Sequence, residues 1–80
     1  MRADIVSYTV VILPPEEAGE AWGVLVPYLP GCVTQGWTRA EALAMAEDAI
    51  RLHIDALAAD GLPVPREPRP PQVDTVSILN

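Results

Sequence analysis

The chain has one cysteine, Cys32, and one histidine, His53, among its 80 residues. One cysteine cannot form an internal disulfide, and a lone thiol is typical of proteins from a reducing cytoplasm. One histidine cannot supply a His-rich metal site or a histidine dyad. We therefore expect a cytoplasmic protein that holds no metal ion and no cofactor.

Basic residues and long apolar runs are also scarce. The chain has five basic and eleven acidic residues, which gives a formal net charge of -6. Such a surface repels phosphates and favours basic partners, although acidity also simply keeps small proteins soluble. The basic residues are scattered, so none form a patch around Trp22 or Trp37 on which bases would stack.

No apolar run approaches the roughly 20 residues of a membrane helix. Residues 1–4 lead into no cleavable signal. We expect no direct nucleic-acid binding and no membrane association.

The size of the chain predicts one domain over residues 1–80. Half of the residues are hydrophobic, which is too many for a disordered chain. A domain of about 60 residues buries only about 60% of the surface that its unfolded chain exposes, so the core is modest. We expect self-association, as a dimer or a tetramer, to contribute to stability.

Apolar patterning predicts three antiparallel strands in the first half of the chain. Residues 5–13 are nearly all β-branched or aromatic, which indicates a strand buried on much of both faces. Pro14 and Pro15 end this strand. Residues 22–26 alternate as a second strand that pairs with the first as a hairpin. A third strand over about residues 32–37 follows the turn formed by Leu29, Pro30 and Gly31.

A long helix follows. Thr38 is the predicted N-cap, Glu41 completes a capping box, and Gly61 marks the C-terminal end. One stripe of apolar residues, predicted to pack on the sheet, comprises Leu43, Ala46, Ile50, Ile54 and Leu57. A second apolar stripe comprises Met45, Ala49, Leu52 and Ala56. One sheet cannot cover both stripes, so the second is either partly exposed surface or a contact with another subunit.

Proline dominates the segment after the helix. Residues 63–71 predict an extended, polyproline-like crossing, and the alternation over residues 73–78 predicts a fourth strand. The predicted order is β-β-β-α-β. This is an α+β fold with one long helix on one sheet.

Reactive side chains do not converge in this pattern. Cys32 would need a nearby base to act as a nucleophile, and burial as a small hydrophobe is the simpler role. His53 flanks the first helical stripe, which suits a packing histidine better than a general base. Asp48 and Asp55 bracket Arg51 in a solvated ion-pair row rather than a metal site. We expect no enzymatic activity. The alternative is a small enzyme that uses Cys32 or His53.

Several motifs in series resemble the HicB-like antitoxin family. A strand led by Tyr8 precedes Pro-Tyr-Leu-Pro-Gly-Cys at residues 27–32. Thr34, Gly36 and Thr38 follow at alternate positions, then Glu-Ala at residues 41–42 and Gly-Leu-Pro-Val-Pro at residues 61–65. The resemblance covers roughly residues 5–65 and is to the short form of the family, without the C-terminal DNA-binding domain of longer members.

The resemblance implies a partial RNase H-like fold without nuclease activity, in agreement with the absence of an acidic residue at positions 8–12. It implies an antitoxin of a type II toxin–antitoxin system. The partner would be a HicA-like toxin, a small basic ribonuclease that cleaves mRNA and that the antitoxin neutralises by stoichiometric binding. Because the chain ends after the predicted fourth strand, we do not expect it to repress its own operon alone. The alternative is an orphan HicB-like domain that self-associates without a toxin partner or binds another partner.

Aromatic and apolar residues around the central turn are candidates for the partner contact. Such residues dominate the desolvated centres of protein interfaces. We expect Tyr28, Leu29 and Trp37 to anchor the toxin, with roles in the turn and the core as the alternative. The second helical stripe is the candidate contact between subunits.

Overall fold

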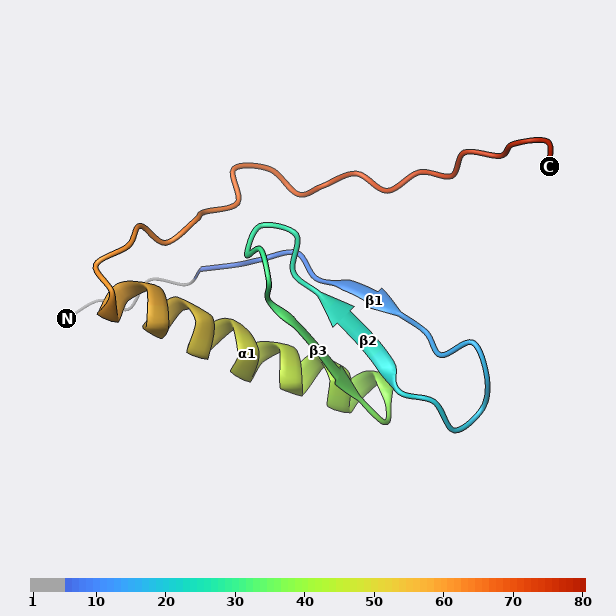
Figure 1. Ribbon diagram of the computed structural model, residues 1–80, viewed down its shortest axis with the longest axis horizontal. Helices are drawn as coiled ribbons and strands as arrows, with labels where there is room; N and C mark the ends of the chain where they lie inside the picture. Colours follow the sequence, from blue (N-terminus) through green and yellow to red (C-terminus); the bar gives the residue numbers. More distant parts are fainter. Residues whose placement is uncertain (1–5) are drawn as a thin grey trace.

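The structure, a computed structural model, describes residues 6–80 (Figure 1). Three strands, β1 (Val11–Leu13), β2 (Trp22–Leu25) and β3 (Val33–Gly36), form an antiparallel sheet in the order β1-β2-β3. The helix α1 (Arg39–Ala59) packs on one face of this sheet, mainly against β3 and β2. The predicted α+β class, the three-stranded antiparallel sheet and the single long helix are confirmed.

Strand β1 is shorter than the sequence pattern predicts. In the register of the sheet, Val11 lies opposite Leu25, and β2 ends at Leu25. The chain then turns, because the Leu29 N–H donates to the Val26 carbonyl at 3.0 Å and the Cys32 N–H donates to the Leu29 carbonyl at 2.9 Å. Residues 6–10 therefore have no partner strand and remain outside the ladder. Residue 5, where the predicted strand begins, lies outside the described part of the chain.

Both ends of α1 form as predicted. The Glu41 N–H donates to Thr38 Oγ1 at 3.0 Å, which is the first half of the predicted capping box. The carboxylate of Glu41 accepts from the backbone N–H of Trp37 at 3.2 Å, one residue before the N-cap, rather than from that of Thr38. At the other end Gly61 has a φ of 69°, and the Leu62 N–H donates to the Leu57 carbonyl at 2.9 Å. This is the Schellman arrangement for which glycine is favoured.

The face of α1 that meets the sheet is rotated from the predicted one, although Ala46 and Ile50 of the predicted stripe do pack in the core. Ala42 and Ala46 are buried against Val24, whereas Leu43 and Ile54 are half-buried on the flank of the helix. The cause is close packing at Gly36, where a Cβ would lie 2.5 Å from the Ala42 nitrogen. Only small residues permit this approach. The helix therefore turns its alanines toward the sheet and leaves the larger residues at the side.

A second core cluster forms around the turn between β2 and β3. It consists of Val26, Leu29 and Cys32, all buried, with Leu29 completely inaccessible. Further apolar residues pack against it: Tyr8, Val10, Ala49 and Ile50. The turn that carries the family-like motif is thus part of the hydrophobic core.

The predicted fourth strand does not form in this structure. Residues 63–80 carry no strand or helix, and Val76 and Ile78 are 87% and 84% exposed. The segment contacts the rest of the molecule near its start. There the Thr9 N–H donates to Glu67 Oε1 at 2.8 Å, and the Tyr8 hydroxyl donates to the Pro65 carbonyl. It then runs past the sheet as an extended chain (Figure 1).

Candidate functional site

The face of the sheet opposite α1 is largely apolar, and no helix or strand among residues 6–80 packs on it. Successive residues of a strand point to opposite faces, and Val24 points to the helix. Its neighbour Leu25 therefore points away, together with the residues paired with it, Val11 in β1 and Val33 in β3. Leu13 shares this face. We call these four residues, Val11, Leu13, Leu25 and Val33, the open sheet face.

The open sheet face is accessible to a partner. Val33 is 69% exposed and Leu13 is 50% exposed, whereas Val11 and Leu25 are half-buried between their neighbours. Four aliphatic side chains from three adjacent strands thus form one continuous patch. Apolar patches without cover commonly mark protein interaction sites.

Trp37 follows the end of β3, in the bend that leads into α1 and two residues beyond the polar Gln35. The side chain of Trp37 is exposed. The backbone N–H of Trp37 donates to Glu41 Oε1, which fixes the backbone at the start of α1. Of the three predicted partner-binding residues, Trp37 has the most accessible position.

Tyr28 and Leu29 lie elsewhere. Both belong to the turn between β2 and β3, at the opposite end of β3 from Trp37. Four residues of strand correspond to about 13 Å, so the structure does not bring Tyr28 and Trp37 together. Leu29 is completely buried and supports the turn from inside, and Tyr28 is half-buried.

The predicted subunit stripe on α1 is divided between surface and core. Met45, Leu52 and Ala56 are exposed, with Leu52 at 70%. Ala49 instead packs against the core cluster of Val26, Leu29 and Cys32. A contact on this side of the helix would therefore rest on the other three residues.

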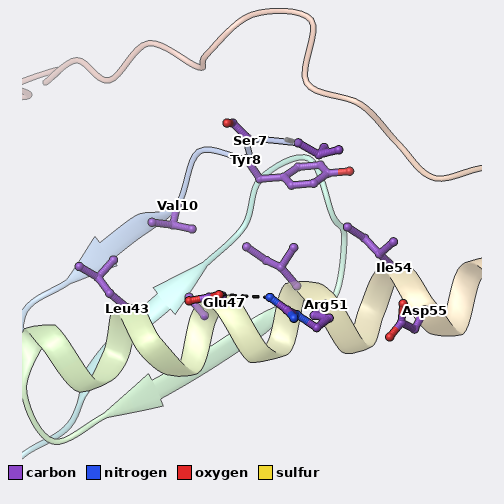
Figure 2. A pocket seen from close by; sticks show the side chains of 11 residues that line it. Ser7, Tyr8, Val10, Leu43, Glu47, Arg51, Ile54 and Asp55 are labelled. Atoms are coloured by element: carbon purple, nitrogen blue, oxygen red, sulfur yellow. Dashed lines mark hydrogen bonds and ion pairs between the residues drawn. The ribbon is translucent and has the colours of Figure 1, made fainter. Parts of the chain in front are cut away.

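A hollow of about 500 Å³ lies between residues 6–10 and the flank of α1 (Figure 2). Its apolar lining includes Tyr8, Val10, Leu43, Ile50 and Ile54. Glu47, Arg51 and Asp55 form the rim, where Arg51 Nη2 lies 3.2 Å from Glu47 Oε1 in an exposed ion pair. Exposed pairs of this kind contribute little to stability. The hollow offers an apolar surface for packing.

The two residues considered for catalysis do not meet in a reactive arrangement. Cys32 is buried among aliphatic side chains, and desolvation raises the pKa of its thiol, so the thiol stays protonated. His53 is half-buried on α1. Within residues 6–80, neither side chain forms a hydrogen bond to another side chain. Cys32 thus occupies the packing role that its sequence context favours.

Two further searches of the described chain were negative. Among residues 6–80, no three histidine, cysteine, aspartate or glutamate side chains gather closely enough to bind a metal ion. The same residues contain no helix with the length and apolar character required to cross a membrane.

The charge distribution favours a basic partner at the open sheet face. Glu16, Glu17 and Glu20 lie in the loop between β1 and β2, beside Leu13 at the end of β1. All three are exposed, and the chain as a whole carries a net charge of -6. An apolar patch beside a negative loop suits a partner with apolar and basic groups.

The sequence did not single out Leu13, Leu25 and Val33. The nearly continuous apolar residues of the first strand suggested burial on both faces. The alternation of Val33 with Gln35 and Trp37 was the available signal that one face stays open, because it leaves large apolar residues on a short edge strand.

The family model of the HicB-like antitoxins of bacterial toxin–antitoxin systems matches residues 8–77. A UPF0150 protein of Thermoplasma acidophilum is 43% identical over 60 residues, which cover 75% of this chain and 84% of that protein. A UPF0150 protein of Synechocystis is 38% identical over 60 residues, which cover 75% and 76% of the two chains. An uncharacterized 14.9 kDa protein of Haemophilus phage HP1 is 35% identical over 51 residues, which cover 64% of this chain and 38% of the phage protein. No solved structure gives a significant match.

Proposed function

The chain belongs to the HicB-like antitoxin family of bacterial toxin–antitoxin systems, and on this premise we propose that it neutralises a toxin by binding it. The toxin would be a HicA-like protein, a small basic ribonuclease that cleaves mRNA. The system would be of type II, in which the antitoxin protein occupies the toxin stoichiometrically and masks its active site. No catalytic step by this chain is required.

The observation that carries the proposal is the open sheet face. Full burial of a valine or leucine side chain contributes about 1.5–3 kcal/mol. Leu13 and Val33 are exposed by half or more, so each has about 1–2 kcal/mol available for a partner to recover. The glutamates beside this patch would attract the basic surface of the toxin and accelerate encounter.

The candidate anchors take different roles in this proposal. Trp37 would lie at the margin of the contact, where an exposed aromatic ring can insert into the partner. Tyr28 would contact the toxin at the other end of β3. Leu29 would hold the turn beneath Tyr28 in place from the core.

The proposal includes the finer features that the family resemblance implies. The sheet and helix would form a partial RNase H-like domain, completed by a fourth strand on association. The protein would reside in the cytoplasm, where mRNA is translated, and would not bind nucleic acid directly. The protein would form a homo-oligomer, and if two dimers join into a tetramer they would use the exposed part of the helical stripe, Met45, Leu52 and Ala56.

Co-expression with the product of the adjacent gene tests the proposal. If that product arrests growth, the wild-type chain should restore growth and the two proteins should co-elute. The Val33→Asp variant should do neither. The Leu52→Asp variant should do both, because Leu52 is equally exposed but lies in the helical stripe proposed for contact between subunits, so this variant separates self-association from toxin binding at the open sheet face.

The same experiment identifies the alternative. An adjacent product that is not toxic, or a toxic one that the chain neither binds nor counteracts, would refute neutralisation of that partner. An orphan HicB-like domain that only self-associates would then be the better description. Equal loss of rescue in both variants would refute the assignment of the binding surface.

A further inference from the structure

We propose that residues 73–79 of one copy of this chain form a strand on the outer edge of β1 in a second copy, which produces a strand-exchanged dimer. We call residues 73–79 the C-terminal segment. The proposal concerns assembly of the chain with itself and goes beyond toxin binding.

In the part of the chain that the structure describes, no strand pairs with the outer edge of β1. In the order β1-β2-β3, one side of β1 pairs with β2. On the other side, the Thr9 N–H and hydroxyl donate to the Glu67 carboxylate at 2.8 Å and 2.6 Å. Alternate residues of a strand direct their N–H groups to one edge, so we expect the N–H groups of Val11 and Leu13 to face outward like that of Thr9. Within residues 6–80, no backbone hydrogen bond joins this edge to another segment. Such an edge is a template for pairing with another chain.

The C-terminal segment of the same copy does not pair with this edge. The contacts at Thr9 bring Glu67 beside the start of β1, and a bend at Pro68 and Arg69 then carries the chain away (Figure 1). Three of the four residues 68–71 are prolines, which have no N–H to donate to a ladder.

Distances along the chain agree with this. If residues 68–72 followed β1 in extended form, they would cover about 15 Å. The stretch from Thr9 to Leu13 covers about 13 Å, so residue 73 would lie beyond Leu13, where Pro14 and Pro15 end the strand. In the structure residues 68 and 69 form a bend instead, and residues 73–79 form no strand with β1 of their own copy. This edge is therefore open to the C-terminal segment of another copy.

The C-terminal segment has the composition of a strand. Valine, isoleucine and threonine are frequent in it, and its backbone is already extended. Its apolar side chains are strongly exposed: Val73, Val76, Ile78 and Leu79. The match to the family model extends through residue 77, so five of the seven residues of this segment lie within the family domain.

The hollow beside the outer edge of β1 can receive one row of these side chains. Figure 2 shows Tyr8 and Val10 on one side of the hollow and residues of α1 on the other. Leu43, Ile50 and Ile54 line it with half-buried aliphatic groups that the three-stranded sheet does not cover. A strand added next to β1 would direct alternate side chains toward this flank of α1.

Charge favours a second copy over the basic toxin as the occupant. Asp74 is the single charged side chain in the C-terminal segment, so the segment offers little to a basic surface. Two copies with a net charge of -6 repel each other over most of their surface, but less so where an almost uncharged segment meets an apolar hollow. Two-fold symmetry would fill both edges with both segments in one interface.

Light scattering during gel filtration of the full chain tests the proposal. The wild type should have twice the monomer mass of 8.6 kDa. The double variant Val76→Asp/Ile78→Asp should raise the dissociation constant of the dimer by about 100-fold or more, because it places charges in an apolar contact. The matched control Thr75→Asp/Ser77→Asp adds the same charge to the opposite row and should remain dimeric. Both variants lie outside the core, so helical circular dichroism should be unchanged.

An NMR experiment on mixed labelled and unlabelled copies identifies the edge. Nuclear Overhauser contacts between residues 73–79 and residues 9–13 should occur between different copies. A monomeric wild type, contacts within one copy, or a dimer that both double variants weaken equally would overturn the proposal. Contacts of the C-terminal segment that form only after addition of a toxin would overturn it as well.

Discussion

Replacement of Gly36 by alanine should destabilise the protein more than any other single methyl group added to the sheet. A Cβ at this position would lie 2.5 Å from the Ala42 nitrogen and 2.8 Å from the Ala42 Cα and the Glu41 carbonyl carbon. All three are backbone atoms in the first turn of α1, which the hydrogen bonds of Glu41 with Thr38 and with the Trp37 N–H hold in place. No side chain can rotate away to relieve the overlap.

The size of the effect follows from these distances. Carbon atoms in contact are normally about 3.5–4.0 Å apart, so α1 would have to retreat from β3 by about 1 Å. Overpacking of this kind typically costs about 1–3 kcal/mol. Retreat would also loosen the buried cluster of Val24, Ala42 and Ala46. The lower entropy of the unfolded alanine variant offsets about 0.4–1 kcal/mol. We expect a net loss of about 2 kcal/mol in the free energy of unfolding.

Urea unfolding followed by helical circular dichroism measures this loss, and Gly23→Ala is the matched control. A Cβ at Gly23 would meet Leu13 Cβ at 3.6 Å, an ordinary contact, so this variant should differ from wild type by less than about 0.5 kcal/mol. A Gly36→Ala variant as stable as the wild type would refute the close packing of α1 on β3. Equal losses in both variants would also refute it.

Three further predictions concern the cap, the C-terminal region and the buried thiol. Thr38→Ala removes the acceptor of the Glu41 N–H and should lower the free energy of unfolding by about 1 kcal/mol in urea titrations; an unchanged midpoint would contradict the capping role. Glu67→Ala should accelerate hydrogen exchange at the Thr9 amide and leave helical circular dichroism unchanged; unaltered exchange would show that this contact does not protect the edge. Burial raises the pKa of Cys32 above that of the unfolded thiol, so the folded state retains its proton to higher pH. Stability should therefore fall as the pH rises above about 8.5. Cys32→Ala should show a smaller alkaline loss in urea titrations across this range, and an identical pH slope would refute the desolvation effect.

Local signals in the sequence account for what could be predicted. Thr38, Glu41 and Gly61 define the ends of α1 because capping depends on residues a few positions apart. The turn at Leu29 and Gly31 likewise separates β2 from β3 through its own hydrogen bonds and a positive φ at Gly31. These elements need no information about distant parts of the chain.

Long-range packing accounts for the differences. The helical period predicted Leu43, Ala46 and Ile54 as contacts with the sheet. Ala46 is confirmed as one, but the approach permitted by Gly36 brings Ala42 there and leaves Leu43 and Ile54 on the flank. The alternation over residues 73–78 predicted a strand, but none forms in the structure, where the chain bends at residues 68 and 69 and residues 73–78 do not join the sheet. Pairing depends on a distant partner edge, which alternation along one segment does not reveal.

The candidate site was less predictable than the fold. The turn motif indicated the family correctly, but its residues serve the core as much as the surface, as the complete burial of Leu29 shows. The open sheet face depends on which side of the sheet α1 covers. Hydrophobic alternation alone cannot decide this when both faces of a strand are apolar.

Direct titration of the purified toxin candidate encoded beside this chain tests the central claim most directly. Calorimetry should give a fixed stoichiometric complex that blocks RNA cleavage, with Val33→Asp weakening affinity by about 10-fold or more because it forfeits roughly 1–2 kcal/mol of apolar burial and buries a charge. Leu52→Asp should bind the toxin like wild type. Undiminished affinity of Val33→Asp, or a toxin fully active in the presence of excess chain, would contradict the assignment of the open sheet face as a toxin-binding surface.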